Sequence, residues 1–485
     1  MSWWWTKLFE KKLAIATTDY LRRIQAPSVA PVLNAGNGIL LGYAGSQPVI
    51  VPLEDLIAHS ICTGSSGAGK TLFDCIVIEA LLQHGLPFGV IDPKGELFDR
   101  ALYLSAAYGQ LDRTVIIDFG NRTAISPYNI LAPWGDDFDF FIHSRLETLK
   151  ELLPGRDKLS LRAAGALKEC LALLAESSRP IPDLLRVLED ASFRARLVRG
   201  SRNPGTKYYF QKIFPKENPG TVASLSARIA ALFSSEGLRY ALAARTAPDF
   251  RRLQDDGYII LVKCGGPAIS RGVRMLLQAL ALSDVRQSGF ARKNSRPYMW
   301  FLDESQNFFL NRQQTEDLEE ILRMGRSYGM FLHLITQHLS TGVDRGTLDL
   351  IQGAIIRWSM SFRNSPQDTL FLKPALPVSR RLVKPSEPFT ERQYYTENEE
   401  RTLLHDGIAK LPDRVGYLWL KTRGGTAMKL KTKSLSLPHL AEVVEEIKND
   451  PDIGSRVSRA ELSERTITEE PAADLEERMR RAYRK

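Results

Sequence analysis

Eight residues in the first part of the chain have the pattern G-x-x-x-x-G-K-[ST] of a phosphate-binding loop. Its glycines let the backbone curl so that N–H groups point at phosphate oxygens. Lys70 is predicted to bridge the β- and γ-phosphates of a nucleotide, and the Thr71 hydroxyl to hold Mg²⁺. The expected cofactors are therefore ATP and Mg²⁺, bound by Gly64, Ser65, Ser66, Gly67, Ala68, Gly69, Lys70 and Thr71.

An acidic pair at the end of an apolar run is the second candidate element of this site. The run 298–302 leads directly into Asp303 and Glu304. Asp303 is predicted to coordinate Mg²⁺, directly or through water, and Glu304 to polarise the attacking water. A second carboxylate favours hydrolysis over simple nucleotide binding. The alternative is an acidic cap on the next helix.

Three further polar residues flank the apolar run 330–335. Gln337 follows this run and is predicted to contact both the γ-phosphate and the attacking water. Arg323 and Arg326 precede it, and either is a candidate arginine finger for a neighbouring subunit. The alternative for each arginine is an ordinary surface position.

The elements that must position these residues alternate between strands and helices. A buried helix is predicted over 71–84, from its apolar spacing. Apolar runs typical of strands in a mostly parallel sheet lie at 60–63, 88–91, 114–117, 258–262, 298–302, 330–335 and 354–356. A hairpin is predicted from 417–421 and 427–430. Between the predicted strands at 114–117 and 258–262, helical periodicity dominates, at 141–153, 160–175, 183–188 and 222–233.

Composition narrows the class of protein. The four cysteines form no C-x-x-C pair, which argues against a disulfide framework or a zinc ribbon. Net charge is +9; the segment from residue 441 has 9 Lys and Arg against 12 Asp and Glu, so the body before it carries +12. A basic body suits a polyanionic partner such as nucleic acid without requiring one.

The sequence contains two basic clusters and a run of tryptophans. The hairpin cluster and the tryptophan run each allow two interpretations. Arg380, Arg381 and Lys384 form one cluster, and the hairpin carries the other, at Lys421, Arg423, Lys429, Lys431 and Lys433. The hairpin lysines either contact a phosphate backbone or are solvated charge. Trp3, Trp4 and Trp5 lie in a segment that either packs on the body as a helix or contacts a membrane surface. No apolar run reaches the roughly 18 residues of a membrane span.

With these residues in place, the chain resembles the conjugative coupling proteins of type IV secretion (TraG/TraD type), within the FtsK–HerA group of RecA-like motor ATPases. The stretches that carry the resemblance are 64–71, 90–96, 303–304 and 325–337. The phrase from Asp92 to Glu96, DPKGE, is the most specific of them. The phrase at 128–131 matches only in part, because Ile130 stands where the family has proline.

The resemblance covers roughly residues 39–432 and implies a fold and its boundaries. It implies an α/β fold, with a RecA-like P-loop NTPase core and mostly parallel sheet, an inserted all-α subdomain and a charged C-terminal tail. The expected domains are an N-terminal helix or arm at 1–38, the core at 39–133 and 251–435, the all-α insertion at 134–250 and the tail at 436–485.

The resemblance also implies a function. It implies a hexameric ring that hydrolyses ATP and moves DNA, as a single strand or as nucleoprotein. Arg326 corresponds by position to the arginine finger of the family, which acts on the nucleotide of a neighbouring subunit. The other expected catalytic residues are Lys70, Glu304 and Gln337. Further expected partners are a relaxase and other secretion components. The family usually carries N-terminal transmembrane helices, which this sequence lacks, so the expected location is the bacterial cytoplasm or the cytoplasmic face of the inner membrane. The alternatives are a soluble HerA-like DNA motor, a secretion ATPase with protein cargo, and a nucleotide-gated recruitment scaffold.

Overall fold

The computed structural model describes residues 38–458, except 122, 134–136, 154–158, 233–241, 245–246, 267–268, 311, 340–342, 344, 354, 380–393, 422–424 and 455–456. The tryptophan run and the cluster at 380, 381 and 384 lie outside the described residues, as does Arg423. The chain divides into two compact units. Their described parts are named here the glycine-loop unit (38–90 and 295–438) and the helical unit (91–294 and 439–458).

The glycine-loop unit contains a sheet that is parallel in its centre. Its strand order is β2 (Gln47–Pro52), β1 (Gly38–Ala44), β12 (Met428–Thr432), β11 (Val415–Leu420), β10 (Trp358–Ser361), β3 (Ser60–Thr63), β9 (Met330–Thr336) and β8 (Tyr298–Leu302). The strands β10, β3, β9 and β8 are parallel, whereas β11, β12, β1 and β2 pair antiparallel. The strands predicted at 60–63, 298–302 and 330–335 and the hairpin are confirmed.

One predicted strand is wrong. The strand expected at 354–356 is instead β10, which begins at Trp358 and contains Ser359 and Ser361. Both serines are fully buried, and Ser361 Oγ accepts a hydrogen bond from Thr63 Oγ1 at 3.1 Å. The strand was missed because its sequence, WSMS, alternates apolar residues with serines and therefore contains no apolar run.

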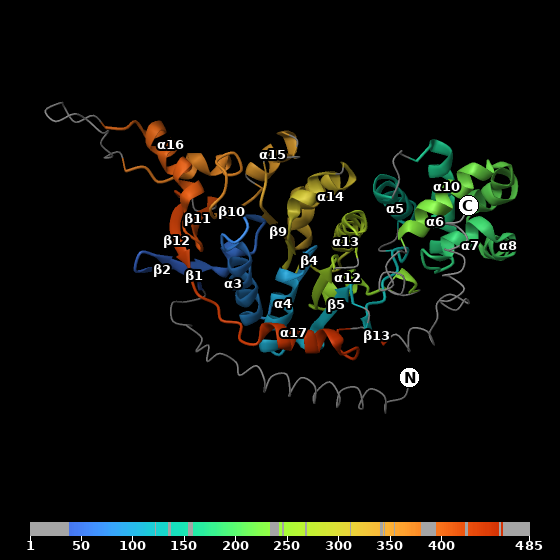
Figure 1. Cartoon of the computed structure of the whole chain (residues 1–485), viewed down its shortest axis with the longest axis horizontal. Helices are drawn as coiled ribbons and strands as arrows, with labels where there is room; N and C mark the ends of the chain where they lie inside the picture. The colour runs from blue at the N-terminus through green and yellow to red at the C-terminus, as the bar shows by residue number, and fades with distance from the viewer. Residues whose placement is uncertain are drawn as a thin grey trace. The chain divides into compact units, whose positions relative to one another are not determined.

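The glycine-loop unit also contains helices. They are α2 (Leu53–Leu56), α3 (Lys70–Gln83), η4 (Ser305–Leu310), α14 (Arg312–Met324), η5 (Gly325–Tyr328), α15 (Arg345–Gln352), η6 (Leu370–Ala375), α16 (Glu397–Gly407) and η7 (Ile408–Lys410). Of these, α3, α14, α15 and α16 are labelled in Figure 1. Most residues of α3 are buried, on all sides of the helix. A helix that is buried on all sides lies in the interior of a protein, and the helix predicted over 71–84 is confirmed.

The helical unit begins within β4 (Phe88–Asp92) and contains the parallel pair β5 (Thr114–Asp118) and β7 (Ile259–Lys263). Every described element between 138 and 255 is a helix: α5 (Phe138–Leu152), α6 (Leu161–Glu176), α7 (Asp183–Glu189), α8 (Ala191–Gly200), α9 (Pro204–Tyr208), η2 (Tyr209–Ile213), η3 (Phe214–Lys216), α10 (Pro219–Leu232) and α12 (Phe250–Asp255). The unit also contains α4 (Glu96–Ala107), η1 (Leu111–Arg113), β6 (Ala124–Ile125), α13 (Arg271–Phe290), α17 (Leu440–Asn449) and β13 (Val457–Ser458). The helical periodicity read from the sequence is confirmed.

Asp92, in the phrase DPKGE, organises the turn between β4 and α4. Its buried carboxylate accepts hydrogen bonds from the N–H groups of Lys94 at 2.6 Å, Gly95 at 2.7 Å and Phe98 at 2.9 Å. Burial raises the pKa of this carboxyl above its ordinary value, and the three N–H donors oppose that shift. Gly95 has φ 100, and a Cβ there would lie 2.8 Å from Lys263 Cε. The phrase therefore has a structural explanation: it fixes a tight strand-to-helix turn.

Residues 440–449 form α17, which the sequence analysis did not identify. Val443, Val444 and Ile447 of this helix are buried, and Lys448 pairs with Asp99 of α4. The helix was missed because its exposed face is charged, so its composition resembles that of a solvated tail. Among the described residues, no helix is both long and apolar enough to cross a bilayer.

His59, immediately before β3, gives the stability of the glycine-loop unit a pH dependence. Its Nδ1 accepts the N–H of Leu332 at 3.0 Å. Burial, assisted by the charge of Arg326, lowers the pKa of His59 from 6.5 to about 4. The unfolded chain therefore binds more protons than the native chain between these two pH values, so native stability is complete above pH 6.5 and falls as the pH decreases toward 4.

We expect the free energy of unfolding of the wild type to fall by about 2 kcal/mol more than that of His59→Asn between pH 7 and pH 5. The asparagine side chain can still accept the Leu332 N–H but does not titrate. Urea denaturation at both pH values measures the difference. Equal pH dependence of the two proteins would contradict this origin.

Candidate functional site

The predicted phosphate-binding loop joins β3 to α3. The N–H of Gly64 donates to Thr336 O at 3.2 Å, and the N–H of Ser65 donates to Arg363 O at 2.8 Å. These bonds tie the start of the loop to the carboxyl ends of β9 and β10. Gly67 and Gly69 have φ 75 and φ 114, a conformation that L side chains rarely adopt. Glycine is therefore required here by backbone conformation.

Lys70 lies at the end of the loop, as the first residue of α3. Its side chain turns back so that Nζ donates to Gly64 O at 2.6 Å and to Ser65 O at 3.1 Å. No side chain caps the N-terminus of α3, and the first N–H groups of a helix have no intrahelical acceptor. An ammonium group and a helix N-terminus thus meet at one place, which suits an anion such as phosphate.

The segment before β11 packs against the loop, a feature that sequence reasoning missed. The N–H of Arg414 donates to Ala68 O at 2.9 Å, and a Cβ on Gly69 would lie 3.1 Å from Arg414 Cα. Arg414 has φ 66, a strained conformation for a residue other than glycine. No local pattern in the sequence marks this position.

The acidic pair lies at the same edge of the sheet as the loop. Strand β9 lies between β3 and β8, with Thr63 beside Thr336 and Leu302 beside Leu334. Adjacent strands are ~4.8 Å apart, so the strand leading to the loop and the strand leading to Asp303 are about 10 Å apart. The three parallel strands therefore bring the loop, Gln337 and the acidic pair to one carboxyl edge.

Glu304 has two amide donors on its carboxylate. Gln337 Nε2 donates to Glu304 Oε1 at 2.6 Å, and Gln306 Nε2 donates to Oε2. Gln306 Oε1 in turn accepts the Thr336 hydroxyl at 2.9 Å. The sequence analysis predicted Glu304 and Gln337 but missed Gln306, whose signal was its place two residues after the acidic pair.

The backbone of Glu304 is in the left-handed region, with φ 50, and its side chain is 8% exposed. For a residue other than glycine this conformation costs of order 1 kcal/mol, and such strain gathers at functional sites. The N–H of Asn307 donates to Glu304 O at 2.9 Å and holds the turn. The strained backbone and the two amide donors fix the direction of the carboxylate.

Arg326 lies at the opposite edge of the same sheet. It belongs to η5, which precedes β9, whereas Gln337 follows this strand. The seven residues of β9 span about 20 Å. Arg326 is exposed, and Arg323 lies 3.9 Å from the Glu319 carboxylate. The structure therefore does not bring Arg326 together with Glu304 and Gln337 of the same chain.

A buried hydrogen-bonded network lies beneath the loop. His333 Nδ1 bonds to Ser60 Oγ at 2.7 Å, and its Nε2 to Asp74 Oδ1 at 2.9 Å. Cys62, Asp74 and His333 lie close enough together for their ligand atoms to hold one metal ion. However, both His333 nitrogens are engaged, and burial together with Asp74 raises the pKa of the Cys62 thiol well above its usual range. The network thus joins β3, β9 and α3 as a structural unit.

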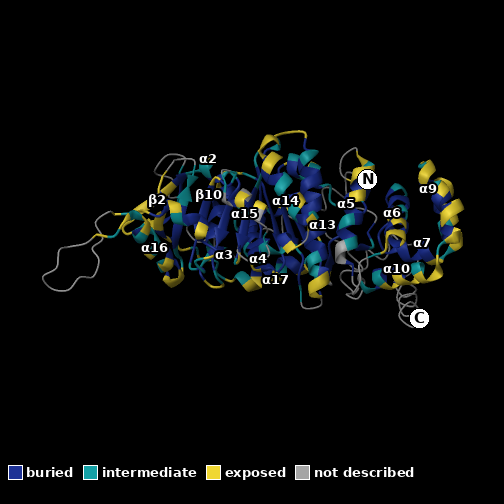
Figure 2. Ribbon diagram, turned by 90° about the horizontal axis from the view of Figure 1, so that it is seen from above, coloured by how far each residue is buried: buried dark blue, intermediate teal, exposed yellow. Residues whose placement is uncertain are grey.

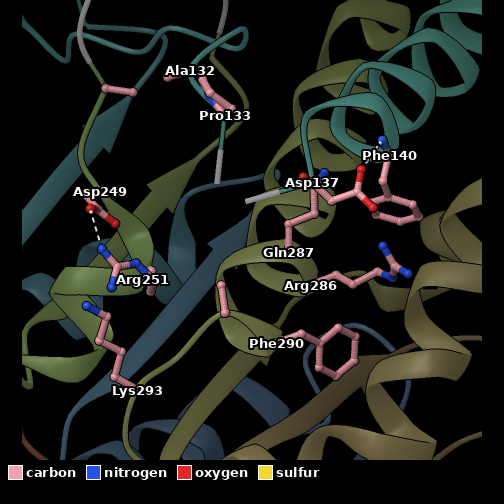
Figure 3. A pocket seen from close by; sticks show the side chains of 12 residues that line it. Ala132, Pro133, Asp137, Phe140, Asp249, Arg251, Arg286, Gln287, Phe290 and Lys293 are labelled. Atoms are coloured by element: carbon pink, nitrogen blue, oxygen red, sulfur yellow. Dashed lines mark hydrogen bonds and ion pairs between the residues drawn. The ribbon is translucent and has the colours of Figure 1, made fainter. Parts of the chain in front are cut away.

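A pocket of about 780 Å³ lies in the helical unit (Figure 3). Its cation Arg286 stacks on Phe140 and Phe290, with 4.7 and 5.7 Å between the guanidinium carbon and the ring centroids. Arg251 pairs with Asp249 at 3.5 Å. Two of the three cations that line the pocket thus have partners in its own wall. The glycine loop and its strand edge therefore remain the stronger candidate site.

Comparisons with known proteins test the fold. No protein-family model and no curated protein matches the chain. Solved structures do match it. The bacterial conjugative coupling protein TrwBdeltaN70 aligns with TM-score 0.55 and 15% identity, over 86% of this chain and 92% of that one. VirB4 of Thermoanaerobacter pseudethanolicus aligns with TM-score 0.55 and 16% identity, over 84% of this chain and 99% of that one.

TrwB in complex with ADP and Mg²⁺ also aligns, with TM-score 0.51 and 16% identity, over 83% of this chain and 91% of that one. At these identities the likeness establishes the fold. It confirms the expected α/β class with a RecA-like P-loop core, and the resemblance in structure to a conjugative coupling protein.

Proposed function

We propose that the chain is an ATPase that drives DNA transfer in a conjugative or type IV secretion-like system. The observation that carries the proposal is the hydrogen bond from Gln337 to Glu304, at the sheet edge that also holds the glycine loop. A loop for phosphates beside a fixed carboxylate is what hydrolysis of a nucleoside triphosphate requires. The alignment with TrwB supports this reaction class, because TrwB has been solved with a non-hydrolysable ATP analogue and with ADP and Mg²⁺.

The residues of the loop fit a nucleotide and its metal ion. A Cβ on Gly64 would lie 2.9 Å from Phe362 Cβ, so only glycine leaves the loop its present path. The Thr71 hydroxyl and the Asp303 carboxylate are oxygen ligands of the kind that Mg²⁺ prefers, and we assign them to it. When bound, Mg²⁺ would neutralise phosphate charge. Lys70 and the N-terminus of α3 would bind the phosphate oxygens directly.

The catalytic roles follow from the positions of the side chains. Glu304 accepts the proton of the attacking water, and its two amide donors keep its carboxylate pointed in one direction. Gln337 holds Glu304 and orients the water. Arg326, at the far edge of the sheet, serves the site of a neighbouring subunit, which requires an oligomer such as a hexameric ring. The proposed cargo is single-stranded DNA or nucleoprotein, and proposed partners are a relaxase and other secretion components at the cytoplasmic face of the membrane.

The test is an ATPase assay on the purified full-length chain with and without single-stranded DNA. We expect hydrolysis that rises several-fold with DNA and is lost in Lys70→Ala under both conditions. The matched control Lys168→Ala, an exposed lysine of α6, should behave as the wild type. Equal rates with and without DNA would contradict the DNA motor. Stimulation by a secreted protein alone would favour the protein-cargo ATPase, and nucleotide-dependent assembly without turnover would favour the scaffold.

A further inference from the structure

The segment 191–216 of the helical unit is strongly basic. It contains seven Lys and Arg and no Asp or Glu. Five of them form what we name the basic helical face: Arg199, Arg202, Lys207, Lys212 and Lys216. Four of these are exposed and Lys207 is partly so. They lie on or between α8, α9, η2 and η3, which follow one another and pack together.

The cations of the basic helical face are not held in ion pairs. Among the described residues, none of its five side chains forms an ion pair. The nearby carboxylates bind neutral donors instead: Glu176 accepts the Ser201 hydroxyl at 2.6 Å, and Glu169 accepts the Thr206 hydroxyl at 2.9 Å. Five cations outside ion pairs, in a segment without an acidic residue, thus remain available to attract a polyanion.

An exposed aromatic ring lies among these cations in the sequence. Tyr208 is 61% exposed, and Ile213 is 41% exposed. Figure 2 shows α9, which carries Tyr208, drawn largely as exposed ribbon. The neighbouring rings of Tyr209, Phe210 and Phe214 are buried and pack on one another, so the helices that carry the exposed residues share an aromatic core. The element η2 is a π-helix, a rare conformation that is frequent at functional sites.

The hairpin cluster predicted from the sequence is a weaker candidate. Lys421 Nζ donates to Gly353 O at 2.9 Å, and burial lowers its pKa to about 8. Lys433 pairs with Glu79 at 2.7 Å. Of the cluster members that the structure describes, Lys429 and Lys431 remain as exposed lysines with no ion pair. The charge available to phosphates is therefore larger on the basic helical face than on the hairpin.

We propose that the basic helical face binds the phosphate backbone of single-stranded DNA and that Tyr208 stacks on a base. This inference rests on the proposed function, in which DNA is the cargo. A single strand is favoured over a duplex because an exposed ring can stack only on an unpaired base. The cations act through charge, so binding by this face is steeply dependent on salt.

The test measures binding of a fluorescent single-stranded oligonucleotide to the full-length protein over a salt series. In the triple variant Arg199→Gln, Lys207→Gln, Lys212→Gln, we expect the slope of log K against log salt to become shallower by about 2, since each phosphate contact on a single strand contributes ~0.7. Tyr208→Ala should weaken binding roughly tenfold at an unchanged slope. The matched control Lys429→Gln, Lys431→Gln should keep the wild-type slope. All substituted side chains are at least partly exposed, so thermal unfolding serves as the check on folding.

Three results would overturn the inference. A wild-type slope in the triple variant, with DNA still bound, would overturn it while leaving the proposed function intact. Absence of both DNA binding at low salt and DNA-stimulated hydrolysis in the wild type would overturn the inference and the proposed function together. Equal binding of a poly-glutamate peptide, with no effect of Tyr208→Ala, would assign the face to an acidic protein instead.

Discussion

Glu304→Gln is expected to reduce ATP turnover by roughly 10³-fold and to leave ATP affinity close to that of the wild type, because a positioned general base contributes about 10²–10⁴-fold. The glutamine side chain has the shape of glutamate, and its carbonyl oxygen can still accept one of the two hydrogen bonds that Gln337 and Gln306 donate to separate carboxylate oxygens. It cannot accept a proton from water. The loss should therefore fall on the chemical step.

Single-turnover hydrolysis and equilibrium binding of a fluorescent ATP analogue separate the two quantities. Glu316→Gln is the matched control, because Glu316 is an exposed glutamate whose contact is a surface ion pair with Arg312 at 2.8 Å. Such pairs contribute little, so this variant should hydrolyse ATP as the wild type does. Wild-type turnover in Glu304→Gln would remove Glu304 from the catalytic role.

Arg326→Ala is expected to reduce turnover by roughly 10³-fold or more without loss of nucleotide binding, which is the size of effect known for arginine fingers. Because about 20 Å of β9 separates Arg326 from Gln337 in the same chain, the guanidinium can reach only the nucleotide of a neighbouring subunit. The loss should therefore depend on assembly.

A mixing experiment tests the action in trans. We expect subunits with Arg326→Ala alone, or with Glu304→Gln alone, to hydrolyse ATP only very slowly. Mixed assemblies contain some sites with an intact Glu304 from one subunit and an intact Arg326 from the next, so hydrolysis should partly return. Arg323→Ala is the control and should remain active, since Arg323 interacts with Glu319 of its own helix. Co-assembly shown by sizing, without any return of activity, would exclude the finger role.

Elements with a local signal were predicted from the sequence, whereas elements whose buried faces contain polar residues, or whose exposed faces are charged, were misplaced or missed. The strand–loop–helix around Lys70 and the central strands were predicted because apolar runs and glycine spacing are visible in a short window. The strand β10 was misplaced and α17 was missed because buried serines and a charged helix face hide their contacts from composition. The basic helical face was also overlooked, although the seven cations of the segment 191–216, which contains no acidic residue, are plain in the sequence.

The sequence by itself determined the chemistry of the site: a loop for phosphates, two carboxylates after a strand and a polar amide after another. These are local properties, since glycine conformations and strand ends are set by adjacent residues. Only the tertiary structure decided which strand ends lie next to one another. It placed β9 between β3 and β8, joined Gln337 and Gln306 to Glu304, and put Arg326 at the far edge. The physical reason is that the order of parallel strands depends on long crossover connections, which no short window of sequence contains.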